Sequence, residues 1–247
     1  MTRIAVVIPA RDEEQALPLV LAELPRERAP LVVVVDNGSL DRTAEVARAA
    51  GALVVREERR GYGRACLAGI GWLLDGAGLV PPLGDEDVIV FLDADHSDHP
   101  QDLEHLLAPI LAREAELVLG SRILGGATWR ALLPQAWLGN RLACALMRAL
   151  FGARYTDLGP FRALRVGTLR DLAMSDPGFG WTIEMQLKAK SRGVRVLEVP
   201  VRYRARIGKS KITGTLTGTL CAGSKILGWI LAWRIASWIN RPARRSR

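Results

Sequence analysis

Short apolar segments and longer amphipathic segments alternate along the first half of the chain. The apolar segments are rich in β-branched residues and are followed by polar residues or proline, as buried parallel strands are. They cover residues 4–8, 31–35, 52–55, 88–92 and 116–119. Between them, helical spacing is predicted over residues 13–24 and 41–50, from the Gly61–Gly63 turn to residue 74, and from Pro100 onward. Strands that alternate with helices predict right-handed crossovers and an α/β fold with an open, mostly parallel sheet flanked by helices.

The pattern is less regular in the second half of the chain. Residues 136–151 and 181–191 have helical spacing, and residues 161–164 and 194–203 are strand-like, the latter with an interruption at Pro200. These segments complete an α/β domain that we place over residues 1–212.

The remaining segment, residues 213–247, is basic and rich in tryptophan. Residues 215–239 have the spacing of an amphipathic helix, but Lys225 and Arg234 interrupt the apolar surface before about 20 apolar residues accumulate, so no spanning helix is predicted. A tryptophan-rich helix with flanking arginines suits a position in a lipid interface. A core helix or a homodimer contact is the alternative.

Composition and charge narrow the class of protein. With 247 residues, 49% of them apolar, the chain fits one globular domain with a short appendage. Three widely spaced cysteines indicate neither a disulfide framework nor a zinc motif, which favours a reducing compartment. The first apolar run is too short for a signal peptide, so we expect a cytoplasmic protein.

Charge is distributed unevenly along the chain. Eleven Lys and Arg but no Asp or Glu follow Glu198, whereas the preceding residues carry a slight acidic excess. A cationic and apolar C-terminal segment predicts an anionic partner, either a phosphate group or a membrane surface. Nucleic acid is not expected because no nucleic-acid-binding motif is present.

Candidate chemistry lies where three predicted strands end. Polar clusters occupy residues 9–13, 36–39 and 93–95, and each alone is typical of a turn or a helix cap. In open parallel sheets, however, ligands bind beyond the carboxyl ends of the strands, so three such clusters together predict a binding site. Asp93 and Asp95 would repel each other in one cleft unless a cation lay between them. Their hard oxygen ligands suit Mg²⁺ or Mn²⁺, which commonly complete their shell with substrate phosphates.

The order of motifs resembles family 2 glycosyltransferases of the GT-A (Rossmann-like) fold. The motifs are VVIPARDEE, VVDNGSLDRT, RGYGRACLAG, FLDADHSDHP, GSR, YTDLGPFRAL, GWTIEMQLKAK and RARIGKSKITGT, and they extend over about residues 3–215. The chain looks most like the dolichyl-phosphate mannose and glucose synthases. The resemblance implies an inverting enzyme that transfers a hexose from a nucleotide-diphosphate sugar, of the UDP-glucose or GDP-mannose type, to a polyprenyl (dolichyl or undecaprenyl) phosphate.

Position by position, the resemblance also implies the residues of the donor site. Those that match contacts to the base, the ribose or the nucleotide are Pro9, Arg11, Glu13, Asp36 and Arg64. Those that match the metal and diphosphate motif, or the basic segment that closes over the diphosphate, are Asp93, Ala94, Asp95, Arg206, Ser210 and Lys211. The family often supplies a further metal ligand after Asp-x-Asp. Asp98 is the expected match here, with His96 and His99 as alternatives.

On the acceptor side, the resemblance implies that Arg122 contacts the acceptor phosphate, with Arg130 a weaker candidate. Asp157 is expected to order the acceptor loop through Arg162. Glu184 lies near the position of the catalytic base in members that glycosylate hydroxyl groups, and it could equally anchor the acceptor loop through Arg162. The predicted catalytic residues are Asp95, Arg122, Asp157 and Glu184.

Two acceptor classes therefore stay open. A phosphate monoester is already ionised near neutral pH, whereas a saccharide or polyol hydroxyl needs a base such as Glu184. The arginines and the cationic C-terminal segment favour a lipid phosphate at the cytoplasmic face of the membrane. A nicotinamide-binding protein is disfavoured because the first strand is not followed by Gly-x-Gly-x-x-Gly. A non-catalytic module that binds a nucleotide sugar or a lipid is the second alternative.

Overall fold

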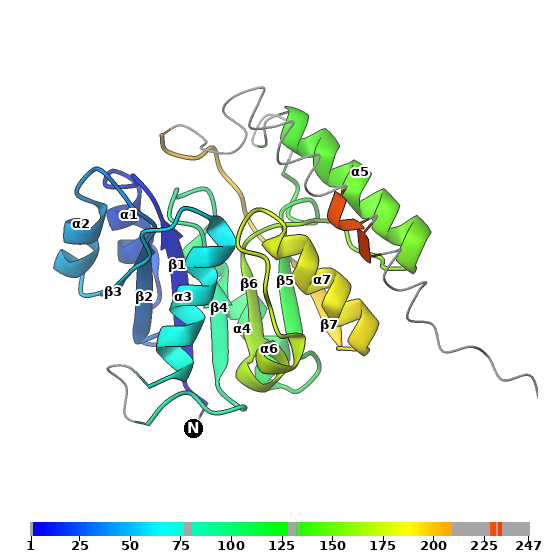
Figure 1. Ribbon diagram of the computed structural model, residues 1–247, viewed down its shortest axis with the longest axis horizontal. Coiled ribbons are helices and arrows are strands. Elements are labelled where there is room, and N and C mark those ends of the chain that lie inside the picture. The colour runs from blue at the N-terminus through cyan, green and yellow to red at the C-terminus, as the bar shows by residue number, and fades with distance from the viewer. Residues whose placement is uncertain are drawn as a thin grey trace, which may run out of the picture.

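A single mixed sheet organises the part of the chain that the computed structural model describes, which comprises residues 2–76, 81–127, 132, 134–208, 228–230 and 232–233. These residues form a seven-stranded sheet in the order β3-β2-β1-β4-β6-β5-β7 (Figure 1). The strands are β1 (Ile4–Ala10), β2 (Leu31–Asp36), β3 (Leu53–Arg56), β4 (Val88–Phe91), β5 (Leu117–Ser121), β6 (Arg162–Arg165) and β7 (Val196–Pro200). All neighbouring pairs are parallel except those of β6, which runs antiparallel to β4 and to β5.

Helices cover both faces of this sheet. They are α1 (Leu17–Glu23), α2 (Thr43–Ala49), α3 (Tyr62–Leu74), α4 (Leu103–Leu111), α5 (Pro134–Phe151), α6 (Val166–Leu172) and α7 (Trp181–Arg192), with a 3₁₀ turn over Pro100–Asp102. Alternation along β1 explains the two layers. Val6 and Ile8 pack on one face with α1, α2 and α4, while Ala5 and Val7 pack on the other with α3, α6 and α7. A strand buried on both faces is continuously apolar, as β1 and β2 are.

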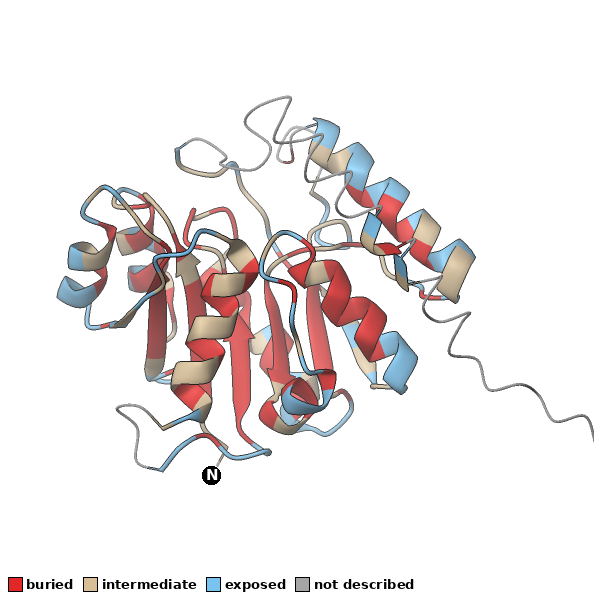
Figure 2. Ribbon diagram, viewed as in Figure 1, coloured by how far each residue is buried: buried red, intermediate tan, exposed pale blue. Residues whose placement is uncertain are grey.

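A smaller third layer lies outside α7. Ala143 and Met147 of α5 contact Ile183 and Leu187 of α7, and Ile230 joins the same cluster. In Figure 2 the side of α5 that faces α7 is buried, whereas its opposite side is exposed. Of the C-terminal segment, 213–247, only residues 228–230 and 232–233 are described, so its predicted helix lies almost wholly outside the described residues. No described helix is long and apolar enough to cross a membrane.

The α/β fold and its mostly parallel sheet are confirmed, with local differences. The helix predicted from residue 13 begins at Leu17, because residues 13–16 form a turn and a proline lies in the first turn of α1. The strand predicted over residues 194–203 ends at Pro200, where proline is tolerated because β7 is an edge strand. Helix α6 was not predicted.

Candidate active site

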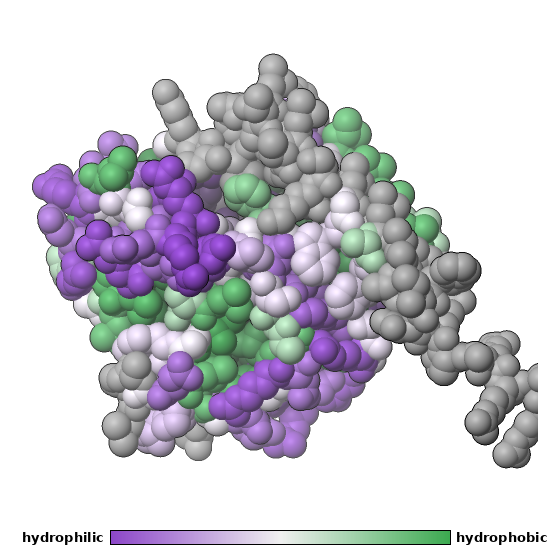
Figure 3. Space-filling view, viewed as in Figure 1, coloured by the Kyte–Doolittle hydropathy of each residue, from purple (hydrophilic) through white to green (hydrophobic). Residues whose placement is uncertain are grey.

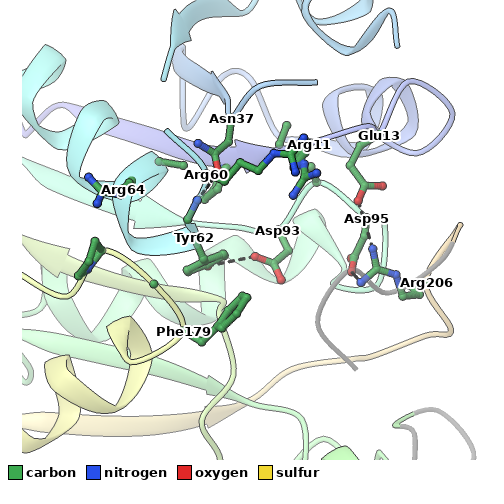
Figure 4. A pocket seen from close by; sticks show the side chains of 17 residues that line it. Arg11, Glu13, Asn37, Arg60, Tyr62, Arg64, Asp93, Asp95, Phe179 and Arg206 are labelled. Atoms are coloured by element: carbon green, nitrogen blue, oxygen red, sulfur yellow. Dashed lines mark hydrogen bonds and ion pairs between the residues drawn. The ribbon is translucent and has the colours of Figure 1, made fainter. Parts of the chain in front are cut away.

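A cavity of about 570 Å³ opens where β1, β2 and β4 end (Figure 4). Because these three strands are parallel, their following loops meet at one edge of the sheet. The cavity is lined by Pro9, Ala10, Arg11, Glu13, Asn37, Arg60, Gly61, Tyr62, Arg64, Ala65, Asp93, Ala94, Asp95, Pro177, Gly178, Phe179 and Arg206. The topology thus brings together most of the residues predicted for the donor, although they come from opposite ends of the chain.

Asp93 and Asp95 follow β4 and present carboxylates to the cavity, each held by different partners. The Tyr62 hydroxyl donates to Asp93 Oδ1 at 3.0 Å. Asp95 Oδ1 accepts from the Ser97 amide at 3.0 Å and the Ser97 hydroxyl at 2.5 Å. Desolvation, followed by repulsion from the Asp95 carboxylate, raises the pKa of Asp93 to about 7. Two crowded carboxylates of this kind are a suitable oxygen donor set for a hard divalent cation.

The guanidinium of Arg206 supplies positive charge at this acidic edge. Its Nη1 lies 3.0 Å from Asp95 Oδ2, and its Nη2 donates to Glu13 Oε1 at 3.1 Å. Backbone hydrogen bonds hold the same segment in place, since the Ile207 amide donates to the Asp95 carbonyl at 3.0 Å. Arg206 therefore links the loop that follows β1 to the loop that follows β4. Ser210 and Lys211, predicted to act with it, lie outside the described residues.

Arginines from two further segments make the wall near β1 and β2 cationic. Arg11, Arg60 and Arg64 line the cavity with Pro9. This arrangement is suited to an anionic ligand such as a diphosphate.

Asp36 is not part of this wall, contrary to prediction. It is buried, its Oδ1 accepts from the Ser39 amide at 3.0 Å, and the cavity lining contains Asn37 instead. Successive residues at the end of a strand point in opposite directions, so only one of the two can face the cavity. Asn37 is itself held in place, accepting from the Gly61 amide and donating to the Glu57 and Arg59 carbonyls.

A loop over residues 175–180 closes the side of the cavity nearest α7. The carbonyls of Pro177 and Gly178 accept from the Arg64 and Gly63 amides at 3.1 and 3.2 Å, which occupies the N-terminus of α3. The backbones are so close that a Cβ on Gly63 would lie 1.9 Å from the Asp176 carbonyl oxygen. This contact places Phe179 in the cavity. Trp229 supports the loop by donating to Asp176 Oδ2 at 2.5 Å.

Glu184 supports this same loop and does not line the cavity. It is fully buried and accepts from the Ser175 amide at 3.0 Å and from the Asp176 amide at 2.8 Å. Its Oε1 also lies 2.7 Å from Lys188 Nζ, one helical turn along α7. The predicted partner, Arg162, was wrong, because the guanidinium of Arg162 instead donates to backbone carbonyls on either side of β6.

On the acceptor side, Asp157 pairs with Arg122 rather than with Arg162. Two bonds form a fork, Nε to Oδ2 at 2.8 Å and Nη2 to Oδ1 at 2.7 Å, and the Arg122 amide adds a third at 2.8 Å. The predicted Asp157–Arg162 pair was wrong because residue 157 lies beside the end of β5, where Arg122 follows the strand. The Tyr203 ring lies 5.1 Å from the guanidinium carbon of Arg122. Neither Arg122 nor Asp157 lines the cavity, and Arg130 lies outside the described residues.

Asp98 does not complete a preformed metal cage. Within the described ranges, no three His, Cys, Asp or Glu side chains gather closely enough to hold a metal ion. Asp98 is buried with no hydrogen bond to either carboxylate oxygen, and burial raises its pKa well above the usual range. The alternative ligand His96 instead contacts Glu23, with Nε2 and Oε1 2.9 Å apart. Asp93 and Asp95 are thus the described carboxylates best placed to hold Mg²⁺ or Mn²⁺.

Among the lining residues with a polar or aromatic side chain, those that were not named individually as site residues are Asn37, Arg60, Tyr62 and Phe179. Three of them adjoin recognised positions, since Asn37 follows Asp36 and the pair Arg60 and Tyr62 flanks Gly61. Phe179 stands in the run Asp-Pro-Gly-Phe-Gly, whose turn residues were a usable signal for a loop. Nothing local indicated that this loop would reach the cavity, because the contact depends on how it docks on α3.

Comparison with known proteins decides the family. A family model described as glycosyl transferase family 2 matches residues 5–172, from β1 to the end of α6. The chain belongs to glycosyltransferase family 2. The matched region contains every residue of the cavity before Pro177, including Asp93 and Asp95.

Relatives and solved structures extend the match beyond the family region. An uncharacterized glycosyltransferase of Mycobacterium tuberculosis is 37% identical over 221 residues, covering 89% of this chain and 94% of that protein. The undecaprenyl-phosphate mannosyltransferase of Micrococcus luteus is 32% identical over 261 residues, covering 98% of each. Glucosyl-3-phosphoglycerate synthase of M. tuberculosis, solved with Mn²⁺, UDP and glucosyl-3-phosphoglycerate, has a TM-score of 0.71 at 24% identity, covering 94% of this chain and 80% of that one. This likeness confirms the GT-A fold.

Proposed function

We propose that this glycosyltransferase moves a hexose from a nucleotide-diphosphate sugar, of the GDP-mannose or UDP-glucose type, to a polyprenyl phosphate, with inversion at the anomeric carbon. The observation that carries the proposal is the composition of the cavity. One edge bears Asp93 and Asp95, and the facing walls bear Arg11, Arg60 and Arg64. A ligand that satisfies both is a diphosphate accompanied by a divalent cation.

The donor would lie across this cavity. Pro9, Arg11 and Asn37 are placed to receive the nucleoside, and Asp93 and Asp95 would hold Mg²⁺ or Mn²⁺. When bound, the cation offsets the negative charge of the departing nucleoside diphosphate. Arg206 already pairs with Asp95 and lines the cavity, so its guanidinium would also be placed to stabilise the negative charge of a bound diphosphate.

The acceptor phosphate would attack the anomeric carbon from the side opposite the diphosphate. A new bond forms between a phosphate oxygen and the anomeric carbon while the bond to the diphosphate oxygen breaks, so no proton has to be removed. Arg122 is the proposed contact for the incoming phosphate. Burial opposes its charge, but the Asp157 carboxylate raises its pKa, so the guanidinium stays positive.

Two observations favour a phosphate acceptor over a hydroxyl acceptor. The acidic residues of the described cavity lining, Glu13, Asp93 and Asp95, are each engaged by Arg206 or Tyr62. Glu184, the candidate base, lies outside the cavity and bonds to its own loop. The 98% coverage shared with an undecaprenyl-phosphate mannosyltransferase supports the same acceptor class. We accordingly propose a peripheral enzyme at the cytoplasmic face of the membrane, with residues 1–212 as the catalytic domain and residues 213–247 as an accessory segment.

A transfer assay tests the proposal. Purified protein with Mn²⁺ is incubated with each radiolabelled donor, UDP-glucose or GDP-mannose, and with polyprenyl phosphate, a saccharide or a polyol. Label should move into a lipid phosphate product with one donor and should require the divalent cation. Transfer to a hydroxyl acceptor but not to polyprenyl phosphate would contradict the acceptor. Donor binding without transfer to any acceptor, including a membrane lipid extract, would favour a non-catalytic module.

A further inference from the structure

Helix α5 has an exposed apolar face. Leu138 and Leu142 are 64% and 48% exposed, large fractions for leucines in the middle of a helix. Ala145 and Ala149 are exposed as well and continue the same stripe at helical spacing. In Figure 3 hydrophobic residues follow the outer edge of α5, on the side away from the sheet. We call these four residues the α5 stripe.

Packing among the described residues does not account for this stripe. The inner face of α5 carries the buried residues Asn140, Ala143, Cys144 and Met147. Ala143 and Met147 join the cluster with Ile183, Leu187 and Ile230, and Trp229 and Trp233 pack against that cluster. Among the residues that the structure describes, the helix is therefore held to the domain by one face, and the stripe is left available for a partner outside this chain.

The charge around the stripe indicates the chemistry of that partner. Helix α5 contains no Asp or Glu, and its two charged residues, Arg141 and Arg148, are both exposed. The guanidinium of Arg141 lies 4.8 Å from the Trp137 ring centroid. An apolar stripe bordered by arginines and a tryptophan, with no acidic residue, complements an anionic lipid surface. A homodimer contact, by contrast, would bring the arginines of two copies close together.

Hydrogen bonds from α5, the helix that carries the stripe, reach the acceptor side of the site. Asn140, on the inner face of the same helix, donates to the Thr156 carbonyl at 3.3 Å and accepts from the Leu158 amide at 2.9 Å. These bonds hold the backbone on both sides of Asp157, whose carboxylate grips Arg122. A surface that contacts the α5 stripe is thus positioned relative to Arg122 by a short chain of hydrogen bonds.

We propose that the α5 stripe docks in the plane of an anionic lipid bilayer, with Leu138 and Leu142 inserted and Arg141 and Arg148 on the headgroup phosphates. The proposal rests on the proposed function for its purpose, which is to bring Arg122 to a lipid-borne phosphate. Its physical basis, an amphipathic helix with a free apolar face, is independent of the reaction.

Flotation with vesicles tests the docking surface. Vesicles of phosphatidylcholine with phosphatidylglycerol should bind the wild-type protein, and Leu138→Gln/Leu142→Gln should reduce the affinity by about tenfold or more. The matched control is Leu19→Gln/Leu40→Gln, since these leucines are 44% and 89% exposed but lie at the α1 and α2 end of the sheet. The control should float like wild type. Arg141→Gln/Arg148→Gln should weaken binding to anionic vesicles and leave binding to pure phosphatidylcholine unchanged.

Each outcome has a defined meaning. Unchanged flotation of Leu138→Gln/Leu142→Gln, with intact thermal unfolding, would overturn the proposal. If that variant instead converts a dimer into a monomer by light scattering while flotation persists, the stripe is a contact between copies and the proposal also falls. Transfer to polyprenyl phosphate in detergent separates the two proposals. The variant should keep that activity but lose transfer on vesicles, whereas docking without any lipid phosphate transfer by wild type would refute only the proposed function.

Discussion

A single arginine performs at the edge of the cavity what a bound cation would otherwise do. Arg206 contacts Asp95 and Glu13 simultaneously, and it neutralises part of the charge that two neighbouring aspartates place there. A divalent ion that binds Asp93 and Asp95 must compete with this guanidinium for the same carboxylate. We therefore expect the cation to displace Arg206 from Asp95 only where a bound diphosphate offers the guanidinium an anionic partner in place of that carboxylate.

Replacement of Arg206 should change two affinities in opposite directions. Because the ion pair is partly exposed, Arg206→Ala should tighten the binding of Mn²⁺ alone by about fivefold. It should weaken the binding of UDP or GDP in the presence of Mn²⁺. Electron paramagnetic resonance of free Mn²⁺ measures the affinity for the metal, and calorimetry measures the affinity for the nucleotide. A loss of both affinities would contradict the competition.

Replacing Asp95 and Glu184 by the corresponding amides should affect activity and stability differently. Asp95→Asn should abolish transfer while leaving the fold intact. Glu184→Gln removes a buried carboxylate that pairs with Lys188 and accepts amide bonds, so it should lower the free energy of unfolding by about 2 kcal/mol and still allow measurable transfer. Urea unfolding and initial rates distinguish the two effects. If folded Glu184→Gln binds donor and is as inactive as Asp95→Asn, Glu184 is a base and the acceptor is a hydroxyl.

Titration of Asp93 should appear in the stability of the metal-free protein. Its pKa is about 7 in the folded chain against an ordinary value of 3.8, so between these pH values only the folded state holds the proton. Stability contributed by this group should therefore fall as the pH rises from about 4 to about 7 and then level off. Urea unfolding with a chelator, compared between wild type and Asp93→Asn, measures it. A difference between the two proteins that does not vary with pH would contradict the assignment.

At the scale of elements, strands were predictable and the contacts between loops were not. Strands β1, β2 and β4 were predictable because strands buried on both faces are continuously apolar. Asp93 and Asp95 were predictable as site residues because they follow β4 directly. The partner of Asp157 was not predictable from the sequence. Arg122 follows one predicted strand and Arg162 lies in another, and only the register of β5 and β6 decides which of them meets Asp157.

The presence of Asn37 and Phe179 in the cavity was not predictable from local sequence patterns either. Which of Asp36 and Asn37 faces the cavity depends on the phase of β2 at its last residue, where strand patterns are least informative. Phe179 enters the cavity because loop 175–180 docks on α3, an event between segments more than a hundred residues apart. Local sequence patterns do not predict contacts between segments so far apart.

Docking of the loop on α3 depends on a glycine. A Cβ at Gly63 would lie 1.9 Å from the Asp176 carbonyl, so Gly63→Ala should displace the loop, destabilise the protein by about 2 kcal/mol or more, and weaken nucleotide binding. Gly71→Ala is a matched control on the same helix, because its Cβ would meet only Asp75 Oδ2 at 3.8 Å. That variant should be stabilised by up to about 1 kcal/mol. Urea unfolding measures both, and equal effects would contradict the close contact.

At the scale of the whole molecule, the two proposed sites are separated along the sheet. The cavity occupies the edge formed by β1, β2 and β4, and the exposed stripe of α5 lies beyond β5 and α7 at the other end (Figure 1). The Arg122–Asp157 pair lies between them, at the end of β5. This order matches a reaction in which a water-soluble donor and a membrane-borne acceptor approach one centre from different sides.

The proposed donor site is tested most directly by a crystal structure with Mn²⁺ and a nucleoside diphosphate, in which the anomalous signal locates manganese. We expect one manganese peak between the Asp93 and Asp95 carboxylates and the diphosphate, with Arg206 displaced from Asp95 onto a phosphate oxygen. A cavity with nucleotide bound but manganese elsewhere, or Arg206 still paired with Asp95 beside a bound diphosphate, would contradict this expectation.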